Sequence, residues 1–147
     1  MVVRVVLDTT VLVAGLRSAS GASRQLLRAA LEKRFTLLLS VPLVIEYEAV
    51  ATRKEHLKAS GLKGAEVVAL LDAMVSVSEP VVPRFRWRPM LRDPDDDMVF
   101  EAAFNGQADL LVTFNRSDFV SHTSKLNIRI ASPAEALREL EKLDEKK

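Results

Sequence analysis

Five short apolar runs are the feature that most limits what this chain can fold into. They lie at residues 2–8, 36–40, 80–82, 109–114 and 128–132, and helical patterns fill most of the sequence between them. The first run is continuous and rich in β-branched residues, which is typical of a strand buried on both faces of a parallel sheet. Strands that alternate with helices along a whole chain predict a three-layer α/β sandwich with a mainly parallel central sheet.

The segments between the runs carry helix signals. Leucines recur at helical spacing within residues 20–35, and Ser40 followed by Pro42 predicts the start of the next helix. Further helices are predicted over residues 64–77 and over residues 97–106, where an apolar stripe ends at a glycine suited to a C-cap. Each of these helices is long enough to cover part of a sheet.

Length and composition indicate one globular domain. The chain has 147 residues, 48% of them apolar and 28% charged, with a net charge of +1. Ser132, Pro133 and Glu135 form a capping-box pattern that predicts a last helix. We therefore expect a single domain over residues 1–140, followed by a frayed, lysine-rich tail at 141–147.

The composition also excludes several classes of protein. No run approaches the roughly 18 apolar residues of a membrane span, and the first residues lack a signal-peptide cleavage site. Cysteine is absent, which excludes disulfides and thiolate metal sites. A cytoplasmic protein that does not contact a membrane is the resulting prediction.

An acidic run stands immediately before the helix predicted at 97–106. Asp93, Asp95, Asp96 and Asp97 place four carboxylates within five positions. Like charges at this spacing repel, and each ionised carboxylate raises the pKa of its neighbours. The run is either a solvated loop that caps a helix or a site that binds a cation.

Further oxygen-bearing side chains fall where a parallel sheet would gather them. Sites in such folds form outside the carboxyl ends of the strands, and the candidates at or near those ends are Asp8, Glu46, Asp96 or Asp97, Asn115 and Asp118. Taken singly, each has an ordinary explanation as a turn residue, a helix cap or a solvated side chain. Together they predict a metal site for Mg²⁺ or Mn²⁺ rather than Zn²⁺, because all the ligands are oxygens.

A basic segment precedes the acidic run. Arg84, Arg86 and Arg88 share one face of an extended chain, with Phe85 and Trp87 on the other. We expect the three arginines to bind RNA phosphates. The alternative is an exposed linker or edge strand whose arginines keep it soluble.

The motifs resemble those of the PIN domain family. The stretches VVLDTTVLVAGL, SGASRQLLRAALEKRFTLLLSVPLVIEYEAVATR, RDPDDDMVFEAAFNGQADLLVTFNRSDF and SPAEAL carry the resemblance over nearly the full chain. It is greatest to the branch described as toxins of toxin–antitoxin pairs. The resemblance implies a metal-dependent ribonuclease on a Rossmann-like sandwich, a homodimer, and a small antitoxin protein as partner.

The resemblance also assigns residues. It makes Asp8, Glu46 and Asp96 the first three catalytic acids, with Asp97 as a neighbouring ligand. Two positions depart from the family pattern. Thr10 stands where an asparagine is usual, and its hydroxyl is expected to bond the first loop and contact substrate. Asn115 stands where a fourth aspartate is usual, and Asp118 is then expected to supply that carboxylate, unless it only caps a surface turn.

The predicted function is a Mg²⁺- or Mn²⁺-dependent endoribonuclease that hydrolyses RNA phosphodiesters. The alternative is a PIN-fold module that binds RNA or protein with weakened catalysis, which Thr10 and Asn115 favour. A receiver domain is disfavoured because Asp8 lacks a paired acid, and a haloacid-dehalogenase-type phosphatase because the chain lacks its D-x-D motif. A P-loop is also absent.

Overall fold

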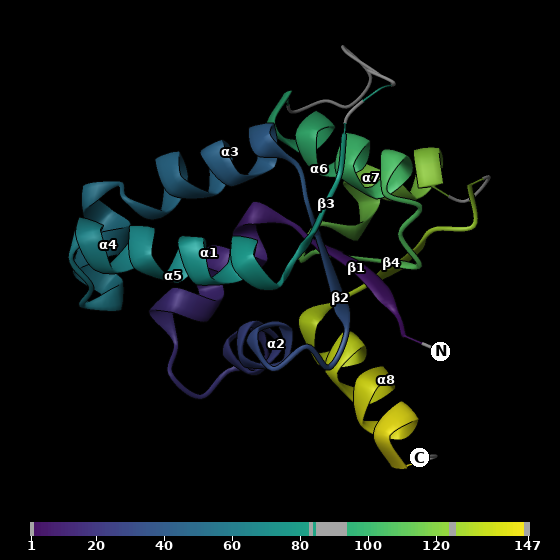
Figure 1. The fold of residues 1–147 in the computed structure, drawn as a ribbon, viewed down its shortest axis with the longest axis horizontal. Helices are drawn as coiled ribbons and strands as arrows, with labels where there is room; N and C mark the ends of the chain where they lie inside the picture. The colour runs from purple at the N-terminus through teal and green to yellow at the C-terminus, as the bar shows by residue number, and fades with distance from the viewer. Residues whose placement is uncertain (1, 83, 85–93, 124–125, 146–147) are drawn as a thin grey trace.

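The computed structural model describes residues 2–82, 84, 94–123 and 126–145 (Figure 1). Its strands are β1 (Arg4–Leu7), β2 (Thr36–Leu39), β3 (Glu79–Pro80), β4 (Leu110–Val112) and β5 (Arg129–Ala131). They form a five-stranded, all-parallel sheet in the order β3-β2-β1-β4-β5. The predicted α/β fold with a parallel sheet is confirmed. Four strands are shorter than the apolar runs that predicted them, and β3 begins one residue before its run and shares only Pro80 with it.

Helices cover the sheet on both faces. They are α1 (Thr9–Arg17), α2 (Ala22–Leu31), α3 (Val41–Ala51), α4 (Lys54–Ser60), α5 (Gly64–Val77), α6 (Pro94–Asn105), α7 (Arg116–Thr123) and α8 (Pro133–Glu145). Helix α6 packs on β1 and β2, whereas α8 packs on β4 and β5 and against α2. In Figure 1, α6 and α7 lie on one side of the sheet and α2 and α8 on the other. No helix in the described part of the chain is long and apolar enough to cross a membrane.

The order of the strands creates one place where the chain reverses its direction across the sheet. From β1 the chain moves outward to β2 and β3, and it then returns past β1 to reach β4 and β5. In parallel sheets the crevice at such a reversal, outside the carboxyl ends of the strands, is where ligands bind. The carboxyl ends of β1 and β4 border that crevice here.

Helix caps that the sequence predicted are present. The Ser40 hydroxyl accepts the N–H of Leu43 (3.2 Å) at the start of α3. At the start of α8, the Ser132 hydroxyl accepts the N–H of Glu135 (3.2 Å), and the Glu135 carboxylate accepts the N–H of Ser132 (3.1 Å). Both caps direct a helix away from the carboxyl end of a strand.

Other segments differ from the sequence expectations. Helix α8 continues to Glu145, well into the predicted tail, and Asp144 pairs with Arg34 (2.5 Å) after α2. The sequence patterns did not identify α1, α4 or α7 as helices. Helix α1 was not predicted because most of its residues are buried. A helix of this kind lacks the continuous polar face from which amphipathic helices are recognised.

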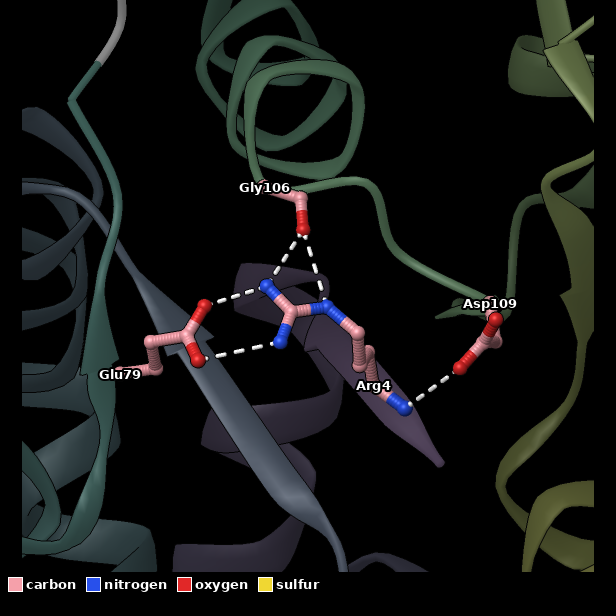
Figure 2. Close-up of polar contacts among 4 residues, drawn as sticks. All are labelled: Arg4, Glu79, Gly106 and Asp109. Carbon is pink, nitrogen blue, oxygen red and sulfur yellow. Dashed lines mark hydrogen bonds and ion pairs between the residues drawn. The ribbon is translucent and has the colours of Figure 1, made fainter. Parts of the chain in front are cut away.

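Arg4 ties the amino-terminal edge of the sheet together (Figure 2). Its guanidinium pairs with both carboxylate oxygens of Glu79 and donates to the Gly106 carbonyl from Nε (3.2 Å) and Nη2 (2.7 Å). Its backbone N–H donates to Asp109 Oδ2 (2.8 Å). These contacts join β1, β3, the end of α6 and the segment before β4 at the edge opposite the crevice.

Gly106 is a glycine because of close packing rather than left-handed backbone. It follows α6 as predicted, and its N–H donates to the Ala102 carbonyl (2.9 Å). Its backbone does not have the positive φ of a left-handed C-cap. A Cβ at this position would lie 2.8 Å from the Ala102 oxygen, 2.9 Å from Val81 Cγ2 and 3.0 Å from Leu38 Cδ1. The end of α6 therefore sits directly on the edge of the sheet.

Candidate functional site

Asp8 stands at the carboxyl end of the central strand. Its side chain is only 2% exposed, and its N–H donates to the Val112 carbonyl (2.9 Å), which extends the pairing of β1 with β4. Carboxylate Oδ2 accepts the hydroxyls of Thr113 (2.7 Å) and Thr10 (3.0 Å). Asp8 is also the N-cap residue of α1. Strand pairing and two hydroxyls thus fix this carboxylate at the mouth of the crevice.

The surroundings of Asp8 favour a positively charged ligand. Burial raises the pKa of the Asp8 carboxyl above its usual value, and the hydroxyls of Thr113 and Thr10 offset only part of that rise. None of the ion pairs found among the described residues involves Asp8. Oγ1 of the neighbouring residue, Thr9, is also buried, and it has no hydrogen-bond partner among the described residues. A cation beside the carboxylate would stabilise its ionised form.

Tyr47 brings α3 to the same strand end. Its side chain is fully buried, and its hydroxyl donates to the carbonyl of Leu7, the last residue of β1. Burial raises the pKa of Tyr47, and the negative charge of Asp8 raises it further, so the two side chains are within electrostatic reach. Glu46 precedes Tyr47 and is half-buried. The predicted second acid therefore lies on a helix turn anchored next to Asp8.

Helix α6 carries the acidic run into the protein. The helix begins at Pro94, so Asp96 and Asp97 lie in its first turn and not in a preceding loop. They are 9% and 1% exposed, which excludes the solvated-loop interpretation for these two acids. Since α6 ends beside Arg4, at the amino end of β1, its first turn lies toward the carboxyl ends of the strands. Asp93 lies outside the described residues.

One buried acid was missed from the sequence. Glu101 is 2% exposed and lies four residues after Asp97 in α6, so the two acids share one face of the helix. An acid inside an otherwise apolar helix segment was the available signal. The sequence pattern drew attention to the apolar stripe around it instead.

The segment after β4 holds the remaining candidates. Thr113 Oγ1, which donates to Asp8, also accepts the N–H of Asn115 (3.0 Å). The Asn115 carbonyl in turn accepts the N–H of Asp118 (3.0 Å), which stands half-buried in the first turn of α7. A continuous chain of hydrogen bonds thus links Asp8 to the segment of Asn115 and Asp118. Thr113, its central member, was not singled out from the sequence.

The predicted substrate-binding residues fall in different places. Thr10 is exposed and bonded to Asp8. Arg84 is exposed and lines a cavity of about 660 Å³ together with Arg4 and Gly106, which stand at the opposite edge of the sheet. Arg86 and Arg88 lie outside the described residues. The structure therefore associates Thr10, but not Arg84, with the crevice.

The candidate oxygen ligands belong to four separate parts of the chain, which are the end of β1, α3, α6 and the segment after β4. Within the described ranges, no three His, Cys, Asp or Glu side chains are close enough to hold a metal ion by themselves. Ionised carboxylates repel one another, and a cation bound between them would offset that repulsion. The candidate ligands offer only oxygen, and the buried Asp8 carboxylate has no ion-pair partner in the part of the chain that the structure describes. Both features fit Mg²⁺ or Mn²⁺, whereas Zn²⁺ would prefer nitrogen or sulfur ligands.

Comparison with known proteins gives one positive finding. A family model described as PIN domain matches residues 4–117. The matched region runs from β1 to the first residues of α7 and includes every metal-ligand candidate except Asp118, which directly follows it. No curated protein matches the chain.

Proposed function

The chain belongs to the PIN domain family, whose members are generally metal-dependent nucleases, and we propose that it is an endoribonuclease that hydrolyses RNA phosphodiesters with Mg²⁺ or Mn²⁺. The observation that carries this proposal is the buried Asp8 carboxylate at the reversal point of the sheet, which lacks an ion-pair partner among the described residues. A fixed anion in a crevice is the usual anchor for a catalytic cation.

The proposed catalytic carboxylates are Asp8, Glu46, Asp96 and Asp118, with Asp97 and Asn115 as further ligands. When bound, a divalent ion would supply Lewis-acid stabilisation of the charge that develops on the phosphate oxygens. The protein's own contribution is orientation. Thr113 and Thr10 set the direction of the Asp8 carboxylate, and Tyr47 holds the α3 turn that carries Glu46. Burial of Asp8 and Asp97 keeps water from competing for their charges.

Thr10 supports an intact first loop. It donates a hydrogen bond to Asp8 Oδ2, so it retains a donor at a position where family members usually carry an asparagine amide. The rival function, a PIN-fold binding module with weakened catalysis, is favoured by Asn115, which brings a neutral amide to the position of an expected acid. Cleavage and binding assays separate the two functions.

The test is cleavage of labelled single-stranded and hairpin RNA by the purified protein in Mg²⁺, in Mn²⁺ and in chelator. We expect cleavage with either metal, none in chelator, and none from the Asp8→Asn variant. Asp72→Asn, which removes an exposed acid from α5, is the matched control and should cleave like the parent. If the protein binds RNA in both metals but leaves it intact, the binding-module function is correct.

The identity of the fourth carboxylate has its own test. If Asp118 supplies it, Asp118→Asn abolishes most cleavage and Asn115→Ala lowers it less. Asn115→Asp should keep or raise the rate, because an added negative charge binds the cation more tightly. The measurement is cleavage rate against Mn²⁺ concentration for the three variants. Parental activity of Asp118→Asn combined with an inactive Asn115→Ala would reverse the assignment.

The cellular role is proposed on narrower grounds. We propose a toxin that acts in the cytoplasm and is inhibited by a small antitoxin, and this part of the proposal is based on the resemblance of the motifs alone. A homodimer has structural support, since Val41 and Ile45 on α3 are 73% and 61% exposed and Val75 on the adjacent α5 is 46% exposed. Exposed apolar side chains on two packed helices suit a protein–protein interface.

A further inference from the structure

A groove of about 610 Å³ opens beside Asp8. It lies between α1, the end of α3 with the start of α4, and Phe114, the second residue after β4. Apolar side chains form part of its lining, namely Val13, Ala14 and Val50, and its polar and aromatic side chains are Thr9, Thr10, Arg17, Ser18, Arg53, His56 and Phe114. Its volume is within the roughly 300–1,000 Å³ that small-molecule sites occupy, so a nucleotide fits in it.

The groove is positively charged. Arg17 and Arg53 are both exposed, and neither forms an ion pair within the described part of the chain. No acidic side chain is found among its described lining residues. Arg17 Nη1 lies 3.4 Å from His56 Nδ1. A guanidinium only donates, so His56 Nδ1 is the acceptor wherever this contact is a hydrogen bond.

Phe114 supplies an aromatic face at one end of the groove. Its side chain is 54% exposed, which is unusual for a phenylalanine two residues after a buried strand. It also borders a second hollow, of about 290 Å³, on the side of α2 and α8. An aromatic ring open to two hollows offers a flat surface on which an unpaired base stacks.

The groove is joined to the Asp8 carboxylate by hydrogen-bonded neighbours. Thr10 lines it and donates to Asp8 Oδ2, and Phe114 directly follows Thr113, which donates to the same oxygen. Thr10 therefore belongs both to the lining of the groove and to the surroundings of Asp8. Neither arginine belongs to the Arg84–Arg88 segment, for which the sequence predicted RNA binding.

We propose that this groove binds an unpaired nucleotide of the RNA next to the phosphodiester held at Asp8. Arg17 and Arg53 contact its phosphates, and Phe114 stacks on its base. The identity of the bond cleaved at Asp8 rests on the proposed function, whereas the binding itself does not. The groove thereby favours single-stranded over duplex RNA, because a paired base has no face available for Phe114.

Binding in chelator tests this proposal separately from catalysis. The probes are a single-stranded RNA, the same strand in a duplex, and the single strand with one abasic position placed in turn along it. Phe114→Ala should weaken binding of the intact strand by roughly 5- to 140-fold, the range for loss of one stacked base. Phe114→Trp should retain binding. For one abasic position, Phe114→Ala should have no further effect, because the stacked base is already missing.

The arginines are tested by salt dependence. Replacing Arg17 and Arg53 together by Gln should reduce the slope of log affinity against log salt by about 0.7 for each lost phosphate contact on a single strand. Arg138→Gln, which removes an exposed arginine from α8, should leave the slope unchanged. An unchanged slope in the double variant would overturn the proposal, as would equal binding of every probe to the parent and Phe114→Ala.

The outcomes distinguish the two proposals. If the parent protein binds these probes through the groove but cleaves none of them, the proposed ribonuclease activity is refuted and the proposed binding site is retained. If Phe114→Ala and the double arginine variant both cleave RNA like the parent, the proposed binding site is refuted and the proposed ribonuclease activity is retained. If poly-glutamate binding falls with Phe114→Ala as much as RNA binding does, the occupant is an acidic protein segment and the RNA proposal is wrong.

Discussion

Removing the hydroxyl of Tyr47 probes the contact that holds α3 against β1. The hydroxyl is buried and donates to the Leu7 carbonyl, so Tyr47→Phe removes one hydrogen bond and leaves a buried carbonyl short of a partner. Such a loss costs about 1–2 kcal/mol, because the bond contributes about 1 kcal/mol and the unpaired group adds its desolvation. The ring itself stays in place, so the packing of the core is preserved.

That free energy converts into a shift of the melting temperature. For 147 residues, an unfolding entropy of about 2.1 cal/mol/K per residue gives roughly 0.3 kcal/mol/K, so Tm should fall by about 3–6 °C. Differential scanning calorimetry measures this directly. Thr52→Val is a matched control, because it removes a hydroxyl that also donates to a backbone carbonyl, that of Glu48 (2.7 Å), at an exposed position. We expect it to cost less than about 0.5 kcal/mol.

The same variant changes the response to alkali and to metal. The raised pKa of Tyr47 stabilises the folded state below the unfolded pKa of about 10, and this contribution is lost as pH rises through the folded value. Tyr47→Phe should lack that alkaline loss. If Glu46 binds metal, the variant should also show a smaller rise in Tm on adding Mn²⁺. A Tm within about 1 °C of the parent, well below the expected 3–6 °C, would refute the proposed role of the hydroxyl.

Three further changes test other parts of the structure. Asp8→Asn should raise Tm in chelator, by an amount that grows as pH rises above about 4, because burial raises the pKa of this carboxyl and its charged form destabilises the fold. The same variant should lose the Mn²⁺-induced rise in Tm, whereas the control Asp72→Asn should behave like the parent in both measurements. Gly106→Ala should cost about 1–3 kcal/mol in urea unfolding, because its Cβ meets backbone at 2.8 Å, whereas Gly64→Ala, with open space around it, should not destabilise. Ile45→Glu should convert a dimer to a monomer in sedimentation equilibrium, and a parent that is already monomeric would refute the dimer.

The sequence predicted the parts of the fold that depend on local pattern. The apolar runs marked all five strands, and the caps at Ser40 and Ser132 placed the starts of two helices. Helix α1 shows where local pattern reaches its limit. It packs against α2, α3 and α4 and six of its nine residues are buried, so its sequence carries little helical periodicity.

The candidate site was predicted unevenly for a related reason. Asp8 was recognisable because an acid ends an apolar strand, but its partner Thr113 was not. That partnership depends on the register in which Leu7 pairs with Val112, and residues 105 positions apart leave no local trace of it. The groove formed by Arg17, Arg53 and Phe114 is harder still, since it draws on three segments that only the tertiary fold brings together.

The register of β1 and β4 also explains why stability and function should be coupled at Asp8. The N–H of Asp8 completes the strand pairing, so the residue cannot move toward solvent without breaking that bond. Its carboxylate is therefore buried by the fold itself, and burial raises its pKa. Two threonine hydroxyls lower the cost of the negative charge but supply no positive charge. A divalent cation supplies that charge, and any ion that binds the folded state alone stabilises it by mass action. The metal-free protein should thus be least stable at the pH where Asp8 is fully ionised, and the same ionisation should give it its highest affinity for Mn²⁺.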